Sequence, residues 1–330
     1  MTAAAAVQLP VVLLYAVGAL ACGSVLRFIA LRKTDPDIRK KRLASLLTWW
    51  VLTLVVAGAV SLGKAGVCAL FFAISCIAIR EYAGIVMPGS AVRSTAWTLY
   101  MLAAVNYLFI LFDKTREFFV FFPISVLMVL ATVNLLKGNP REYVRSTAGM
   151  FFGAVTLVYG LSHTALLFSL PGLPVGPAGV AGWFLYLLIL TEINDITQAL
   201  VGRRFGAHSR HRITPAISPN KTWEGFLGGA LVTTVLAFVL HPWFTAFGTQ
   251  RFSFTGDESL LSVAAGLLIS LSGFFGDINM SAIKRDAGVK DSGKLLPGMG
   301  GLIDRIDSLT FTGPAFVYFL ILVQGKGGLW

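Results

Sequence analysis

Long apolar runs repeat along this chain, and they constrain its fold more than any other feature of the sequence. A helix needs about 20 mostly apolar residues to cross the hydrocarbon core of a bilayer. Charged residues make up 13% of the 330 residues, against about 25% in soluble domains. The sequence therefore predicts an all-α, polytopic integral membrane helical bundle of about ten transmembrane helices. The expected spans are roughly 7–31, 43–62, 65–80, 95–112, 117–136, 146–169, 178–200, 223–247, 259–282 and 306–324.

The charge of the connections predicts which side of the membrane each one faces. With ten spans, all four strongly basic connections fall on the same side: 32–42, 137–145, 201–222 and 283–304. Because basic loops stay in the cytoplasm, we expect these four to be cytoplasmic. The net charge of +11 then reflects basic loops that meet anionic lipid headgroups, so membrane lipids and not nucleic acid are the expected partners. The first apolar run has no basic region before it and is expected to be a retained helix.

Ionisable residues are distributed unevenly between the two halves of the chain. Carboxylates inside membrane spans are costly and usually functional. After about residue 185 they occur repeatedly, at Glu192, Asp195, Glu224, Asp277, Asp304 and Asp307. We therefore expect residues 1–175 to form N-terminal scaffold helices. Residues 176–330 are expected to form the catalytic transmembrane region, with cytoplasmic loops at 201–222 and 283–304.

The stretch 281–307 combines groups that rarely occur together in so short a segment. Its cations are Lys284, Arg285, Lys290, Lys294 and Arg305, and its carboxylates are Asp286, Asp291, Asp304 and Asp307. Glycines near residue 300 supply a backbone that a ligand can approach closely. Cations, oxygen ligands and exposed N–H groups are what a site needs to hold phosphates and Mg²⁺. The alternative is an ordinary charged loop beside the membrane.

Two further segments carry polar groups into the membrane. In SPNKTWEG, residues 218–225, Asn220 or Thr222 could cap the next helix, and Lys221 could hold a phosphate at its N-terminus. Upstream, Glu192 and Asp195 share a helical face with Gln198. That face either lines a polar cavity or makes a polar contact between helices.

These motifs carry a resemblance to a known family. The pattern SAIKR-x4-KD-x5-PGMGGLIDRID at 281–307, with SPNKTWEG, resembles the signature of phosphatidate cytidylyltransferases, or CDP-diacylglycerol synthases. The resemblance extends from about Glu192 to Asp307 and is closest to a divergent bacterial branch. One position departs from the pattern, because Met299 stands where the family has His. If that His acts on substrate, Met299 implies a slow, altered or inactive protein; if it is structural, Met is tolerated.

The resemblance implies an Mg²⁺-dependent transfer of a cytidylyl group from CTP to phosphatidate, giving CDP-diacylglycerol and pyrophosphate for phospholipid biosynthesis. It implies that Asp277 and Asp304 bind the metal. The expected catalytic residues are Lys284, Arg285, Asp291 and Asp307. The expected substrate-binding residues are Ser218, Asn220, Lys221, Ser281, Lys290 and Arg305. The protein would lie in the inner (plasma) membrane as a multi-pass protein with its active site facing the cytoplasm, and a homodimer is a possible assembly.

Two other classes of function stay open at this point. Met299 makes a re-purposed homologue credible, one that binds nucleotide or lipid with little or no turnover. An ion-coupled transporter would also place carboxylates inside the membrane. Its carboxylates should recur through the membrane depth, whereas here they gather near the expected cytoplasmic ends of the spans.

Overall fold

The computed structural model describes residues 35–86, 91–136, 143–206, 211–253, 256–296 and 300–325, with five single residues between positions 18 and 28. The all-α architecture is confirmed, because the described chain is built of helices with one short two-stranded sheet. The expected first span, 7–31, lies almost entirely outside the described residues. So do most of the connection 137–145 and the segment Pro297–Met299.

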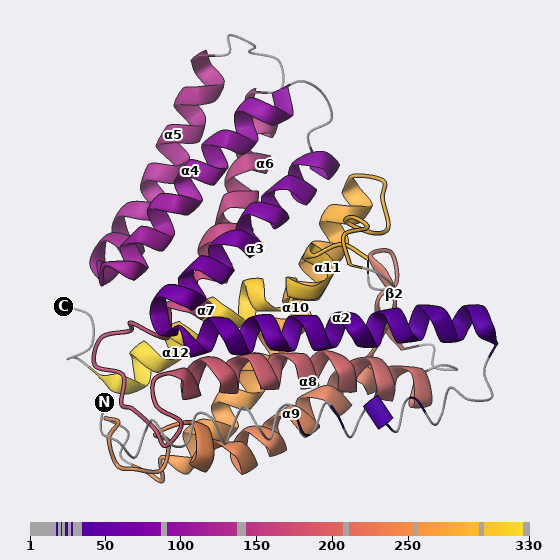
Figure 1. Ribbon diagram of the computed structural model, residues 1–330, viewed down its shortest axis with the longest axis vertical. Coiled ribbons are helices and arrows are strands. Elements are labelled where there is room, and N and C mark those ends of the chain that lie inside the picture. Colours follow the sequence, from indigo (N-terminus) through magenta and orange to yellow (C-terminus); the bar gives the residue numbers. More distant parts are fainter. Residues whose placement is uncertain are drawn as a thin grey trace.

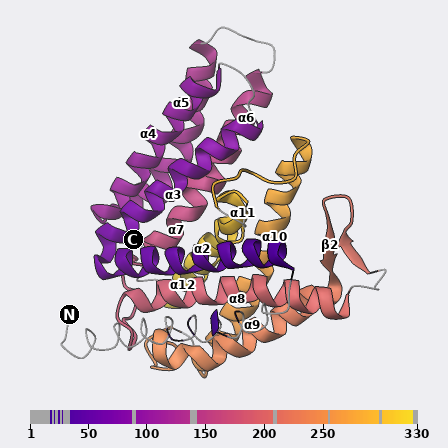
Figure 2. The same cartoon turned by 45° about the vertical axis from the view of Figure 1, so that its right-hand side comes forward.

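The N-terminal half forms a group in which α3, α4, α5 and α6 run beside one another in both views (Figure 1 and Figure 2). The elements are α2 (Pro36–Ser61), α3 (Gly63–Val86), α4 (Ala91–Leu111), the π-helical η2 (Glu117–Phe121), α5 (Phe122–Leu136), α6 (Tyr143–Ala154), the π-helical η3 (Val155–Gly160) and α7 (Leu161–Leu166). Each π-helical segment continues directly into the next helix, so η2–α5 and α6–η3–α7 are two long rods.

The C-terminal half contains α8 and α9 side by side, with α10 packed against both and α12 packed against α10. Its elements are α8 (Ala181–Phe205), β1 (Arg212–Thr214), β2 (Ser218–Thr222), α9 (Trp223–Phe244), α10 (Ser259–Asp286), α11 (Ile303–Ile306) and α12 (Leu309–Gln324). Buried aromatic rings, including Trp183, Tyr186 and Phe316, fill the space between α8 and α12.

The described helices agree with nine of the ten expected spans. Eight segments are long and apolar enough to cross a membrane, and α4 adds a shorter apolar stretch, Ala96–Leu111. Together they match the expected spans from 43–62 to 306–324. The chain is therefore a multi-pass membrane protein, while the count of ten stays a prediction because the first span is not described.

The expected loop 201–222 is largely regular structure. Helix α8 continues to Phe205, and β1 and β2 then form an antiparallel hairpin with Arg212 opposite Thr222. Thr222 ends β2 and begins α9: its Oγ1 accepts a hydrogen bond from Gly225 N at 3.1 Å. Of the two caps that the sequence allowed, Asn220 and Thr222, the structure has Thr222, which fixes the neighbouring Lys221 at the start of α9.

The two halves meet where η3 and α7 cross α12. A Cβ atom added to Gly160 would lie 2.5 Å from Thr310 O, and one added to Gly313 would lie 2.8 Å from Thr164 Oγ1. Small residues at a helix crossing allow this close approach in a membrane, where packing and not water exclusion holds helices together.

Replacing Gly313 by Leu should destabilise the protein, because the added side chain has no space at this crossing. Overpacking costs about 1–3 kcal/mol, so the thermal unfolding midpoint in detergent should fall. The matched control is Gly84→Leu on α3, where an added Cβ meets nothing within 4 Å. Equal melting temperatures for the two variants would contradict the described packing.

The charge asymmetry predicts that the hairpin faces the cytoplasm. A cysteine placed at exposed Asn220, with the native cysteines replaced, should react with a membrane-impermeant maleimide only in inside-out vesicles. Exposed Val175, in the connection before α8, should react only from the outside of intact cells or spheroplasts. Labelling of position 220 from the outside would reverse the assigned orientation.

Candidate active site

The polar ends of several elements meet at one end of the C-terminal half. Helix α10 contacts β2 and α11, and α11 contacts α3 from the N-terminal half. Figure 1 and Figure 2 both show β2, the C-terminal end of α10 and α11 as neighbours. On α10, Asp277, Ser281 and Lys284 follow each other at intervals of four and three residues, so they share one helical face.

The first ion pair of the site joins the hairpin to α10. Lys221 Nζ contacts Asp277 Oδ2, and it also donates to Gln198 Oε1 on α8 at 3.3 Å. One turn further along α10, Ser281 donates to Asp277 Oδ1 at 3.3 Å. Lys221 therefore links three elements, and its charge is neutralised by a carboxylate that the sequence assigned to metal binding.

The second ion pair joins α10 to α11. Lys284 Nζ lies 2.5 Å from Asp304 Oδ1, and the two side chains are only 12% and 11% exposed. The other oxygen, Asp304 Oδ2, accepts from Ser292 N at 3.2 Å, Ser292 Oγ at 3.1 Å and Gly301 N at 3.2 Å. Charge-assisted hydrogen bonds of this kind are stronger than neutral ones, so Asp304 is firmly held.

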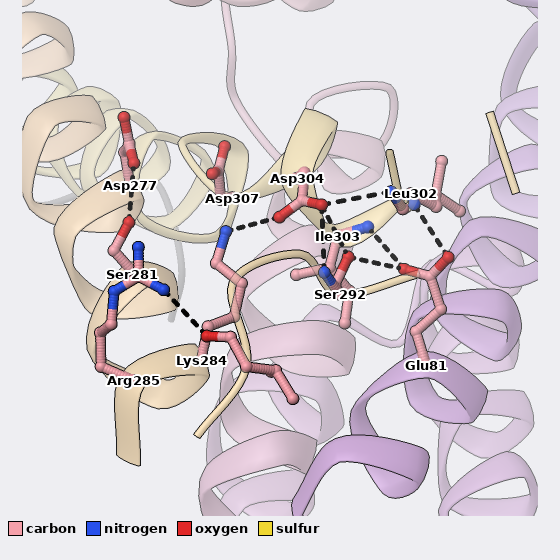
Figure 3. A network of polar contacts seen from close by, with 12 residues as sticks. Glu81, Asp277, Ser281, Lys284, Arg285, Ser292, Leu302, Ile303, Asp304 and Asp307 are labelled. Carbon is pink, nitrogen blue, oxygen red and sulfur yellow. Dashed lines mark hydrogen bonds and ion pairs between the residues drawn. The ribbon is translucent and has the colours of Figure 1, made fainter. Parts of the chain in front are cut away.

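Asp307 is the most buried carboxylate of the predicted set. It follows α11 directly, is 8% exposed, and its Oδ1 accepts from Ser308 N at 2.9 Å. In the view of Figure 3 it lies between Asp277 and Asp304. It is also within electrostatic range of Asp277, Asp195 and Lys284. A buried carboxylate with acidic neighbours favours the binding of a further cation.

Glu81 on α3 is a site component that the sequence analysis did not identify. Its Oε1 accepts from Leu302 N at 2.9 Å, and its Oε2 accepts from Ile303 N at 3.0 Å and Ser292 Oγ at 3.1 Å (Figure 3). The signal was present, because Arg80 and Glu81 are ionisable residues at the end of an apolar run. A single carboxylate at this position does not stand out in the sequence against the six carboxylates that occur after about residue 185.

The remaining predicted residues lie around this network, not within it. Arg285 donates from Nε to Ile217 O at 3.3 Å and from Nη1 to Val289 O at 2.9 Å, so it ties the hairpin turn to the end of α10. Ser218 on β2 is half-buried. Four other predicted residues are exposed: Asn220, Lys290, Asp291 and Arg305. Among the contacts of the described residues, none joins these four to either ion pair.

The described polar contacts of residues 191–198 on α8 are contacts between elements, while a polar cavity along the face of Glu192, Asp195 and Gln198 stays a prediction. Asn194 is fully buried, and its Oδ1 accepts from Thr233 Oγ1 at 3.3 Å and Ser270 Oγ at 2.7 Å. This residue therefore makes the contact between helices, joining α8 to α9 and α10. Gln198 instead reaches the site through Lys221.

The donor atoms at this site suit a hard divalent cation. Mg²⁺ is usually held by one or two carboxylates together with waters and substrate phosphates. Among the described residues no group of three or more His, Cys, Asp or Glu side chains is arranged to hold a metal ion. Each of Asp277 and Asp304 has its own lysine. The carboxylates fit Mg²⁺ in chemical type, and the assignment of both to one shared cation stays a prediction.

Comparison with known proteins agrees with the resemblance seen in the sequence. The Cytidylyltransferase family matches residues 43–323. The uncharacterized protein YnbB of Escherichia coli (strain K12) is 41% identical over 274 residues, which are 83% of this chain and 85% of that protein.

Two relatives are named phosphatidate cytidylyltransferases. The chloroplastic phosphatidate cytidylyltransferase 5 of Arabidopsis thaliana is 32% identical over 299 residues, covering 84% of this chain and 67% of that protein. The phosphatidate cytidylyltransferase of Haemophilus influenzae is 40% identical over 144 residues, 42% of this chain and 46% of that one. With a match over most of its length, and with paired lysines and carboxylates at the polar end of its membrane helices, this chain belongs to the cytidylyltransferase family.

Proposed function

We propose that this protein transfers a cytidylyl group from CTP to phosphatidate, forming CDP-diacylglycerol and pyrophosphate. The observation that carries the proposal is the pair of lysine–carboxylate contacts, Lys221 with Asp277 and Lys284 with Asp304. They lie where membrane helices end, which is where a lipid phosphate and a soluble nucleotide can meet. The names of the Haemophilus and Arabidopsis relatives support phosphatidate as the lipid substrate.

The two lysines are suited to phosphate recognition. A lysine ammonium is a compact charge with three donors, and the triphosphate of CTP presents several oxygens. In the structure a carboxylate neutralises each lysine. A bound triphosphate would compete with these carboxylates for the lysines and so free oxygens of Asp277 and Asp304. Those two residues, with Asp307 close by, would hold Mg²⁺, which supplies positive charge to the triphosphate when bound.

The proposed reaction needs no covalent intermediate with the protein. A phosphate oxygen of phosphatidate attacks the α-phosphorus of CTP. The bond from that phosphorus to the bridging oxygen breaks, and pyrophosphate leaves with the bond electrons. The protein's part is to align the two phosphates and to neutralise the charge that develops on the leaving group. We assign this part to Lys221 and Lys284, with Arg285, Lys290 and Arg305 as further candidates around them.

The orientation of the site follows from the same proposal. The charge rule assigns the basic segments 201–222 and 283–304 to the cytoplasm, so we infer an active site that faces the cytoplasm in the inner (plasma) membrane. CTP is a cytoplasmic nucleotide, in agreement with that orientation. Arrangement as a homodimer stays a prediction.

One observation favours a second candidate function. Met299 replaces a residue that the family signature has as His, and thioether sulfur lacks the donor and the charge of an imidazole. A re-purposed homologue would bind nucleotide or lipid through the same lysines with little turnover. An ion-coupled transporter is less compatible, because Glu224, Asp277 and Asp304 lie near the hairpin and α11 and the chain belongs to a cytidylyltransferase family.

Replacing Asp277 or Asp304 by Asn should abolish turnover, because each change removes a carboxylate oxygen from the proposed metal site and leaves a lysine without its carboxylate partner. We expect a loss of about 100-fold or more in CDP-diacylglycerol formation from radiolabelled phosphatidate with CTP and Mg²⁺. The matched control is Asp113→Asn, which breaks the exposed Lys64–Asp113 ion pair near the opposite end of α3 from Glu81. Activity at the control level in both site variants would exclude the proposed roles.

Replacing Met299 by His distinguishes the two candidate functions. If the imidazole acts on a phosphate, the variant should gain about tenfold or more in rate, since a hydrogen bond to a charged group contributes roughly 1.5–3 kcal/mol. If methionine is tolerated, wild type and variant should turn over at similar rates. Binding of CTP by both proteins without any product would support the re-purposed homologue.

A further inference from the structure

Glu81 connects the N-terminal half of the chain to the segment that carries Asp304. Its two oxygens accept the backbone N–H groups of Leu302 and Ile303 at 2.9 and 3.0 Å. These N–H groups open α11 and so have no partner within their own helix. Glu81 supplies that partner from a different part of the fold, directly before Asp304.

The loop is shaped closely around this carboxylate. A Cβ atom added to Gly293 would lie 2.7 Å from Glu81 Oε1, and one added to Gly301 would lie 2.7 Å from Glu81 Oε2. Real Cβ atoms do not approach other atoms so closely, so both positions require glycine while Glu81 is in place. The two sides of the loop therefore enclose the Glu81 carboxylate without spare room.

Ser292 links Glu81 to Asp304 directly. Its Oγ lies 3.1 Å from Glu81 Oε2 and 3.1 Å from Asp304 Oδ2 (Figure 3). A hydroxyl has a single hydrogen, so Ser292 can donate to only one of the two carboxylates at a time. The hydrogen bonds of Glu81 therefore affect those of Asp304, whose other oxygen faces Lys284.

We propose that Glu81 is a positioning residue of the transferase: it fixes the backbone of residues 302–303 and thereby holds the Asp304 carboxylate against Lys284. Both carboxylate oxygens of Glu81 already accept hydrogen bonds from the protein, so we assign it no contact with a substrate. It acts through Ser292 and through the two N–H groups that precede Asp304. The expected effect of Glu81 on the reaction rate rests on the proposed function. The effect of Glu81 on the loop can be measured independently of turnover.

Glu81→Gln is the informative variant, because glutamine keeps the size of the side chain but replaces one acceptor oxygen by an NH₂ group. The NH₂ group would face a backbone N–H, and it cannot accept a hydrogen bond from that donor. We expect kcat to fall about 10–100-fold, as is typical for residues that orient a metal-binding side chain. The KM for phosphatidate should change far less, since Glu81 makes no substrate contact. Glu117→Gln, an exposed residue of η2, is the matched control and should match wild type.

The second readout is amide hydrogen exchange of the protein in detergent, followed by mass spectrometry. In Glu81→Gln, exchange should accelerate in peptides covering 291–296 and 300–306 and stay at the wild-type level in α8 and α9. Ser292→Ala removes the shared donor and keeps the backbone contacts, so its kcat should fall less. Its effect should also be non-additive with Glu81→Gln, as expected for residues in one network.

The outcomes separate this inference from the proposed function. Wild-type kcat and wild-type exchange in Glu81→Gln would overturn the positioning role. Faster exchange throughout the protein would also overturn it, because Glu81 would then serve general stability. If wild type makes no CDP-diacylglycerol, the proposed function fails, and the exchange pattern alone still decides whether Glu81 holds the loop. Local acceleration would support the inference, and its absence would exclude it.

Discussion

The need to neutralise charge at the ends of apolar helices determines how this protein is built. An ionised side chain with little access to water is stable only beside an opposite charge or several hydrogen bonds. Lys221 with Asp277 and Lys284 with Asp304 meet that need across separate elements. Each pair also fixes the relative positions of two elements, so the groups suited to bind phosphate also hold the site together. A substrate phosphate that replaced a carboxylate as the partner of a lysine would leave the charge of that lysine neutralised.

The N-terminal half supports the site and also contributes a carboxylate, Glu81, to its hydrogen-bond network. It packs against α12 through the close backbone contact at Gly160 and Gly313, and it presents Glu81 at the other end of this contact region. The helices of the first half are apolar, yet one carboxylate from α3 completes the hydrogen bonds of α11. Removing the scaffold would therefore alter the site itself.

The sequence predicts the features of this fold that depend on local composition. Span positions follow from hydrophobicity, and Thr222 could be assigned as a cap because capping uses neighbouring residues. Asp277 and Asp304 stood out as carboxylates beside apolar runs. Partners across elements could not be read in this way, because spacing along the chain does not say which helices touch. The pairing of Asp277 with Lys221, and the backbone contacts of Arg285 and Glu81, therefore required the structure.

The contacts of Glu81 with Leu302 and Ile303 join positions that are 221 and 222 residues apart along the chain. At about 5–20 residues per second, a ribosome needs on the order of 10–40 s to make the intervening chain. During that interval α3 is already available for insertion while the partners of its carboxylate do not yet exist. Glu81 lies near the end of α3 and not at its centre, where an unpaired charge would cost more during insertion. Assembly of this part of the site therefore has to wait until residues 302–303 have been made.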